Sequence, residues 1–256
     1  MSESRTGPVE AARRIWRERY AEARVLFLAG SVLRGEATPA SDLDLVVVYE
    51  RLPHAYREAF VYEGWPVESF VNDPETVGHY FESDRRCGLP SLMRMVIEGV
   101  EIPEACEFSA RLKRRASEIF EAGPPAWDED ELRLRRYRLT DWVDDIRHPR
   151  SPEELVASGA YLYQDAADFF FRARGLWSAH SKTIPRRLRK TDEAFAEKFC
   201  RAFDALFAEK ETAPVIALVE EMLAPFGGLL FEGFRRDAKP EDRSPTDARK
   251  WEGEHG

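Results

Sequence analysis

The alternation of apolar and polar residues predicts several β-strands in the first hundred residues of the chain. The predicted strands share a short apolar or alternating pattern bounded by turn residues, and they cover residues 25–29, 43–49, 56–62, 66–71 and 99–102. The first strand is a continuous apolar run, VLFLA, and the second, LDLVVVY, is rich in β-branched residues. Gly64 and Trp65 separate the third strand from the fourth, which is the pattern of a hairpin.

Helical patterns flank these strands and take over the second half of the chain. Helices are predicted at residues 8–24, 74–83, 90–97, 104–121, 128–147, 152–176, 191–210 and 214–225. No strand-like run follows residue 103. We therefore expect an α+β protein, with an N-terminal α/β domain and a mixed sheet at residues 1–103. An all-helical domain is expected at residues 104–235, and a flexible polar tail at residues 236–256.

Length and charge limit the classes of function. The 256 residues suffice for two modest domains. A net charge of -9 disfavours nucleic acid as a partner, because a general nucleic-acid binder needs an excess of Lys and Arg, and it fits a small-molecule enzyme. No apolar run reaches the roughly 20 residues that a membrane-spanning helix needs, and the N-terminus lacks the pattern of a secretory signal.

The three cysteines give information about the redox state of the cellular compartment. Cys87, Cys106 and Cys200 are widely spaced and odd in number, so they form neither a disulfide framework nor a zinc motif. This usage is typical of a reducing cytoplasm.

Gly30 and Ser31 end the first predicted strand and form a candidate phosphate-binding turn. A glycine lets the backbone approach a phosphate closely, and the serine hydroxyl can donate a hydrogen bond to it. Residues 32–34 can begin a helix, whose N-terminal N–H groups would add further donors. Arg34 is a second candidate for contact with a phosphate, although it could equally be a surface residue.

Asp42 and Asp44 form a candidate metal site at the start of the second strand. They alternate with Leu43 and Leu45, so both carboxylates lie on one face and both leucines on the other. Carboxylate oxygens are the ligands that Mg²⁺ prefers. One or two such ions beside a phosphate-binding turn can orient a nucleoside triphosphate, ATP or another, and stabilise the charge that develops at its α-phosphate.

Gly30 and Ser31, ten intervening residues, and then the pair Asp42 and Asp44 resemble the signature of the DNA polymerase β-like nucleotidyltransferase superfamily. The helical second half looks like that of the small-molecule members, which include the aminoglycoside and lincosamide adenylyltransferases. In that family a third carboxylate lies on a neighbouring strand, and the best match is Glu68, where aspartate is common. The resemblance implies that the three acids are catalytic metal ligands and that Gly30 and Ser31 hold phosphate.

Lys182 is the candidate cation of the helical half. It lies in the basic segment 177–190, WSAHSKTIPRRLRK, which we expect to be an inter-helix loop. Members of the family often supply a lysine to the triphosphate from the helical domain, and the resemblance therefore favours Lys182 as a nucleotide-binding residue. A solvated basic linker is the alternative.

The resemblance implies a magnesium-dependent transfer of a nucleoside monophosphate, AMP from ATP in the first instance, onto a hydroxyl of a small-molecule acceptor. An aminoglycoside-like antibiotic is one candidate acceptor. A protein-modifying adenylyltransferase of the antitoxin type is an alternative, but those are usually short single domains. A nucleotide-binding regulatory module without transfer activity is a second alternative, and a nucleic-acid polymerase is disfavoured by the acidic charge.

Overall fold

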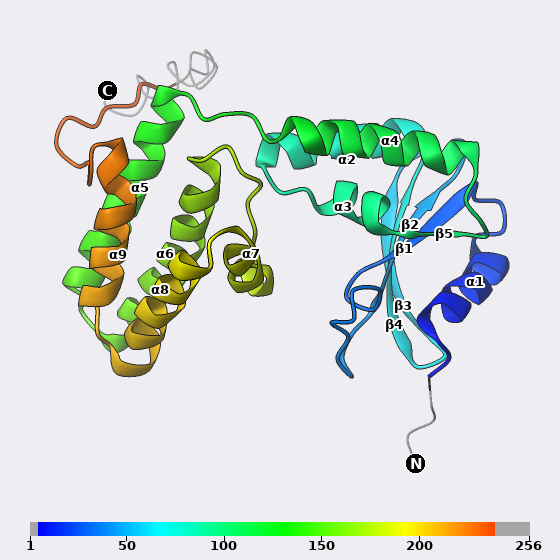
Figure 1. Ribbon diagram of the computed structural model, residues 1–256, viewed down its shortest axis with the longest axis horizontal. Helices are drawn as coiled ribbons and strands as arrows, with labels where there is room; N and C mark the ends of the chain where they lie inside the picture. The colour runs from blue at the N-terminus through cyan, green and yellow to red at the C-terminus, as the bar shows by residue number, and fades with distance from the viewer. Residues whose placement is uncertain (1–4, 239–256) are drawn as a thin grey trace, which may run out of the picture. The chain divides into compact units, whose positions relative to one another are not determined.

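The structure is a computed structural model that describes residues 5–238 and divides the chain into two compact units (Figure 1). Unit 1 comprises Met1–Ala126 together with Phe170–Ser181, and unit 2 comprises Trp127–Phe169 and Lys182–Gly256. Strands occur in unit 1 among the described residues, whereas the described part of unit 2 is helical. The fold is therefore α+β, as the sequence predicts.

Unit 1 is built on a five-stranded mixed sheet. Its strands are β1 (Val25–Ala29), β2 (Leu43–Val48), β3 (Tyr56–Tyr62), β4 (Trp65–Asn72) and β5 (Val100–Ile102). The order across the sheet is β3-β4-β2-β1-β5; β2 and β4 are parallel, and the other neighbours are antiparallel. All five predicted strands are present, including the hairpin at Gly64.

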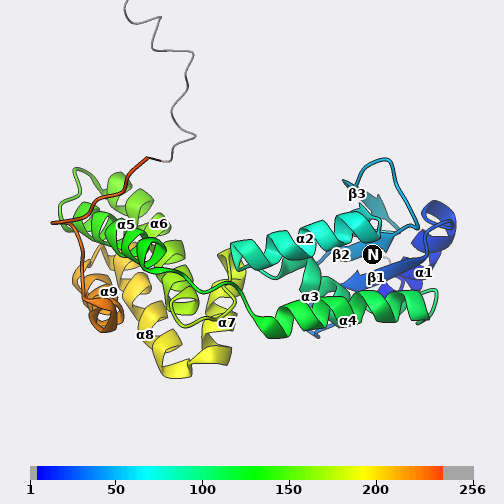
Figure 2. The same ribbon diagram turned by 90° about the horizontal axis from the view of Figure 1, so that it is seen from above.

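Helices cover both faces of this sheet (Figure 2). They are α1 (Pro8–Arg19) on one face, and α2 (Pro74–Cys87), α3 (Ser91–Glu98) and α4 (Glu107–Ala122) on the other. In β1, Leu26 and Leu28 pack in the cluster that contains α1, whereas Val25 and Phe27 pack in the cluster that contains α2, α3 and α4. A strand buried on both faces needs a continuous apolar run, which explains the sequence VLFLA.

The compact sheet unit extends beyond residue 103, where the sequence analysis places the domain boundary. Helix α4 packs on α3 and α2, and the unit continues to Ala126. Phe170–Ser181 also belong to this unit, and in this segment the Trp177 ring stacks on Phe120 with 5.4 Å between the ring centroids. Helical periodicity identifies α4 but carries no information about which layer it joins.

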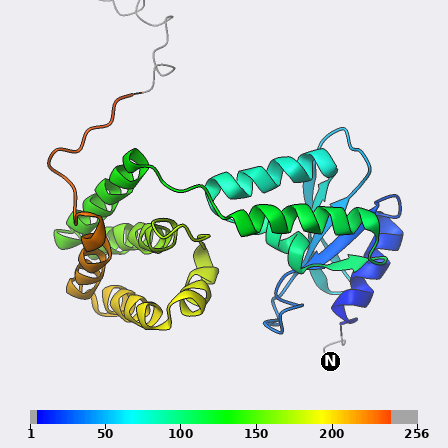
Figure 3. The same ribbon diagram turned by 45° about the horizontal axis from the view of Figure 1, so that its top comes forward.

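The helices of the second half are α5 (Glu129–Arg147), α6 (Pro152–Arg172), α7 (Ile184–Thr191), α8 (Glu193–Asp204) and α9 (Ala213–Leu223) (Figure 3). Two short 3₁₀ helices, η1 (Ser181–Thr183) and η3 (Ala224–Phe226), and one π-helix, η2 (Ala205–Glu209), complete the described part of this half. The rings of Tyr163, Phe199 and Phe203 pack together between α6 and α8, with centroids 4.7 to 4.9 Å apart. In the described part of the chain, no helix has the length and apolar character needed to cross a membrane.

Three predicted boundaries in the helical regions are wrong. The expected loop at 177–190 contains α7, because Ile184 and Leu188 lie four residues apart and are both buried. Helix α6 ends at Arg172 because Gly175, with a φ of 69°, follows in a turn. Helix α1 ends at Arg19 rather than at residue 24. The predicted tail lies almost wholly outside the described residues, since only residues 236–238 of it are described.

Asp84 links α2 to α3 and gives a prediction about pH. Its carboxylate accepts a hydrogen bond of 3.0 Å from the N–H of Met93, in the first turn of α3, where Pro90 provides no side-chain cap. Burial raises the pKa of Asp84 to about 6, against about 3.9 in an unfolded chain. Because the folded state holds this proton more tightly, the contribution of Asp84 to stability is complete below pH 4 and is lost as the pH rises through 6.

We compare the free energy of unfolding of wild type minus that of Asp84→Asn. This difference should fall by on the order of 1–2 kcal/mol between pH 4 and pH 6, after allowance for solvent screening. Urea titrations at several pH values measure it. Asp73→Asn is the matched control with the opposite slope, because the N–H of Thr76 lowers the pKa of Asp73 and its contribution is lost as the pH falls. A difference for Asp84→Asn that stays constant across this range would contradict the prediction.

Candidate functional site

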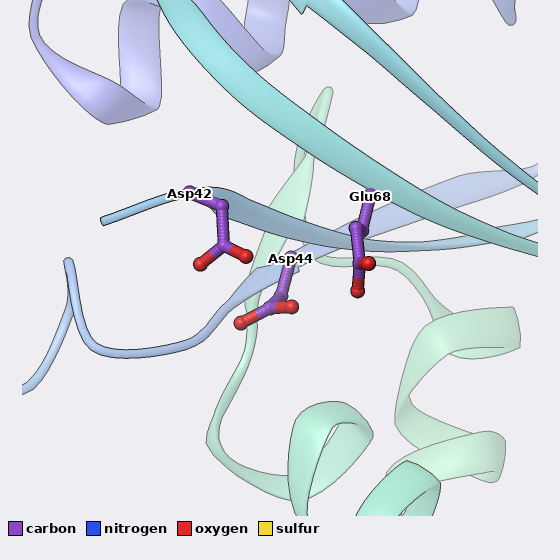
Figure 4. Close-up of side chains that lie close together, drawn as sticks. All are labelled: Asp42, Asp44 and Glu68. Carbon is purple, nitrogen blue, oxygen red and sulfur yellow. The ribbon is translucent and has the colours of Figure 1, made fainter. Parts of the chain in front are cut away.

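Three carboxylates meet at one end of the parallel strand pair (Figure 4). Asp44 lies on β2 and pairs in register with Glu68 on β4, and Asp42 comes directly before β2. One carboxylate oxygen from each residue lies within 4.8 Å of the other two. All three side chains are half-buried, so the cluster is open to ligands while the sheet holds its backbone.

Gly30 lies against this cluster at the end of β1. Ala29 pairs with Asp44 across the sheet, and the chain then turns at Gly30 with a φ of 93°. A Cβ atom built at Gly30 would lie 2.3 Å from the Oδ2 atom of Asp44. Only glycine therefore fits, both because of its left-handed backbone and because Asp44 occupies the space that a side chain would take.

Ser31 joins the two ends of the loop between β1 and β2. Its hydroxyl donates to that of Ser41 at 3.1 Å, and the Ser41 hydroxyl accepts a hydrogen bond from the N–H of Thr38 at 2.8 Å. The residues after Ser31 form turns in which the N–H groups of Arg34 and Glu36 donate to the Ser31 carbonyl. The helix expected to begin at residues 32–34 is therefore absent, and a turn stands in its place.

The two predicted phosphate-binding cations have different surroundings. The Arg34 guanidinium lies 3.3 Å from a carboxylate oxygen of Glu36 and 3.4 Å from one of Glu98, so two acids neutralise its charge. Lys182 is exposed in η1, at the start of the second segment of unit 2.

Arg57 is a residue of this site that the sequence analysis did not identify. It lies on β3 opposite Phe70, and its Nη2 atom lies 2.6 Å from both carboxylate oxygens of Glu68. The pairing register of the hairpin formed by β3 and β4 is the signal that could have identified Arg57. Once Ala59 is paired with Glu68, the alternation of β3 puts Arg57 on the same face as that carboxylate.

The donor set fits a divalent magnesium ion. Mg²⁺ holds oxygen ligands at about 2.1 Å in an octahedron, which places pairs of ligand oxygens about 3 to 4 Å apart. One oxygen each from Asp42, Asp44 and Glu68 lies within 4.8 Å of the other two, which is close to that spacing. Carboxylates without imidazole or thiolate favour a hard cation over zinc.

Residues 9–87 match the family model of the nucleotidyltransferase domain. Over this segment, the chain is similar to a nucleotidyltransferase domain. Within the matched segment lie Gly30, Ser31 and all three clustered carboxylates, which agrees with the resemblance in the sequence analysis.

Among solved structures, the chain is similar to a nucleotidyltransferase-like protein from Exiguobacterium sibiricum 255-15. The identity is 15%, the similarity covers 84% of this chain and 74% of that protein, and the TM-score is 0.42. No curated protein sequence matches this chain.

Gly30→Ala tests the close approach to Asp44. Alanine at a positive φ costs about 1–2 kcal/mol of stability by itself. The new methyl group must also displace the Asp44 carboxylate, and we expect this to weaken Mn²⁺ binding at least roughly tenfold. Calorimetric titration of the full chain with Mn²⁺ measures the affinity.

The matched control is Gly35→Ala, in the same loop of the nucleotidyltransferase domain. Gly35 has a φ of 69°, and a Cβ atom there meets nothing within 4 Å. It should lose similar stability and keep its Mn²⁺ affinity. Equal Mn²⁺ affinities of the two variants would show that Gly30 has no part in holding Asp44.

Proposed function

We propose that the protein is a magnesium-dependent nucleotidyltransferase that moves a nucleoside monophosphate, AMP from ATP in the first instance, onto a hydroxyl of a small-molecule acceptor. The observation that carries this proposal is the cluster of Asp42, Asp44 and Glu68 beside the turn at Gly30. Three acids at the end of a parallel strand pair have no role in the packing of the sheet, and they repel one another without a cation between them.

Asp42, Asp44 and Glu68 would hold the metal ion. When bound, Mg²⁺ supplies charge that neutralises the phosphate oxygens and polarises the α-phosphate. The carboxylates fix the location of that charge through the rigid strands β2 and β4.

The turn after β1 would hold the phosphates. Gly30 has no side chain, so the chain can approach a phosphate closely, and Ser31 can turn its hydroxyl from Ser41 to a phosphate oxygen. To bind a phosphate, the Arg34 guanidinium would have to break its ion pair with Glu98. The acceptor hydroxyl then forms a bond to the α-phosphorus as the bond to the β-phosphate breaks, releasing pyrophosphate and a proton. Positioning and electrostatics supply most of the catalysis in such a transfer.

The helical second half supports a small-molecule acceptor over the two alternatives. A protein-modifying transferase can leave acceptor recognition to its partner, whereas this chain has five further helices after α4 among its described residues. The intact acidic cluster favours catalysis over a purely regulatory role. An aminoglycoside-like antibiotic is one candidate acceptor, because a cationic molecule suits a chain with a net charge of -9.

Asp42→Asn and Asp44→Asn test this function. Each change keeps the side-chain volume and removes one charged metal ligand, so transfer should fall by roughly 10²–10³-fold while the fold is kept. The assay is pyrophosphate release from ATP, GTP, CTP and UTP, with amino-sugar and lincosamide acceptors and with Mg²⁺ present or chelated.

Glu50→Gln is the matched control, because it removes one exposed charge just beyond the opposite end of β2. It should transfer at the wild-type rate. Near-normal turnover of Asp42→Asn or Asp44→Asn with Mg²⁺ would mean that the active site lies elsewhere.

Lys182→Ala tests whether the helical half contributes a cation to the nucleotide. A nucleoside triphosphate carries more negative charge than one metal ion can neutralise, so an added cation is physically expected. Loss of one charged hydrogen bond should raise the KM for ATP roughly tenfold. Lys190→Ala, at the far end of α7, is a control of equal charge. If both variants have the wild-type KM, segment 177–190 is a solvated basic segment with no role in nucleotide binding.

A further inference from the structure

Arg57 contacts the candidate metal centre without being able to bind a metal itself. Its Nη2 atom lies 2.6 Å from Oε1 and from Oε2 of Glu68. Its guanidinium carbon also lies 4.8 Å from the centroid of the Phe70 ring, the residue that faces Arg57 across the hairpin. The ring and the carboxylate together hold the guanidinium in one place.

Stability does not explain this contact. The Arg57 side chain is 60% exposed and that of Glu68 is 33% exposed, and exposed ion pairs usually contribute between about 0 and 1 kcal/mol. The significance of the pair lies in its location, because Glu68 is one of the three clustered acids. The small side chain of Ala59, which pairs with Glu68, leaves room for the guanidinium to reach diagonally across the strands.

We propose that Arg57 is a positioning residue for the metal centre, an inference that rests on the proposed function. Arg57 contacts both oxygens of Glu68 and so limits the rotation of this carboxylate beside the oxygens of Asp42 and Asp44. Its positive charge also offsets one of the three negative charges of the cluster, and this lowers the affinity of the free enzyme for divalent metal.

The two effects of Arg57 predict opposite changes when it is removed. Without the guanidinium, the cluster of three carboxylates is more negative by one unit charge and attracts a divalent ion more strongly, by roughly three- to tenfold in affinity for a unit charge a few ångströms away. The freed Glu68 side chain, however, samples more rotamers. A misplaced ligand about 1 Å from its reacting position lowers turnover by up to roughly 100-fold. A purely structural residue would instead weaken metal binding and turnover together.

The experiment compares the full chain as wild type, Arg57→Gln and Arg57→Lys. Mn²⁺ affinity is measured by electron paramagnetic resonance without nucleotide, and kcat is measured by pyrophosphate release. We expect Arg57→Gln to bind Mn²⁺ roughly three- to tenfold more tightly and to lose roughly 10- to 100-fold in kcat. Arg57→Lys keeps the charge, so it should bind Mn²⁺ like wild type and recover part of kcat.

Arg19→Gln is the matched control. The Arg19 guanidinium also lies over an aromatic ring, 3.9 Å from the centroid of Phe60, and 4.0 Å from a carboxylate oxygen of Glu58 on β3. Glu58 and Phe60 point to the sheet face opposite Arg57, so this variant should keep both the Mn²⁺ affinity and kcat of wild type. If Arg57→Gln does not fold, Arg57→Met replaces it, because its unbranched stem still covers Phe70.

Each outcome decides a different claim. Unchanged or weaker Mn²⁺ binding in Arg57→Gln overturns the proposal, and so does an unchanged kcat. If the wild-type protein binds Mn²⁺ but transfers no nucleotide, the proposed function is wrong. The proposal for Arg57 is then tested by the Mn²⁺ affinities alone. A wild-type protein that binds no Mn²⁺ overturns both.

Discussion

The parallel pairing of β2 with β4 places Asp44 beside Glu68, and hydrophobic burial fixes that pairing. On β4, Val67 and Val71 are 1% and 0% exposed on the α1 side of the sheet, while Glu68 projects to the other side. A slip of one residue would bury the carboxylate against α1 and move both valines to the open end of the other face. The free energy of burying apolar side chains therefore holds a cluster of like charges together, although these charges repel one another.

The arrangement around this cluster follows from where the apolar layers end. The N-terminal part of β2 lies beyond the helices that cover Val46 and Val48, so Asp42 and Asp44 remain half-buried and open to ligands. Gly30 permits the chain to turn against Asp44, and Arg57 holds Glu68 from the edge strand β3. Backbone pairing and the missing side chain at Gly30 thus constrain Asp44, and the ion pair with Arg57 constrains Glu68. Rigid strands hold such a site more tightly than loops would.

The helical half has a different physical character. Its core combines aliphatic side chains with the rings of Tyr163, Phe199 and Phe203, which are in mutual contact. The short helix α7 buries Ile184 and Leu188 and carries the basic residues of segment 177–190. A basic helix is a physically reasonable partner for a triphosphate, and the role of Lys182 stays a prediction.

Sequence patterns alone determined the five strands, most of the helices and the pair Asp42 and Asp44, because periodicity and residue type are local properties. Glu68 was identified through the family resemblance, which implies a third carboxylate on a neighbouring strand. The patterns also located the turn at Gly30, since a Gly-Ser pair that ends an apolar run leaves few other backbone conformations. Only the tertiary structure decided that α4 belongs with the sheet, that α7 replaces a loop, and that Arg57 pairs with Glu68. Those features depend on contacts between segments far apart in the chain, and the register and packing that create such contacts are set by the burial of the whole core rather than by neighbouring residues.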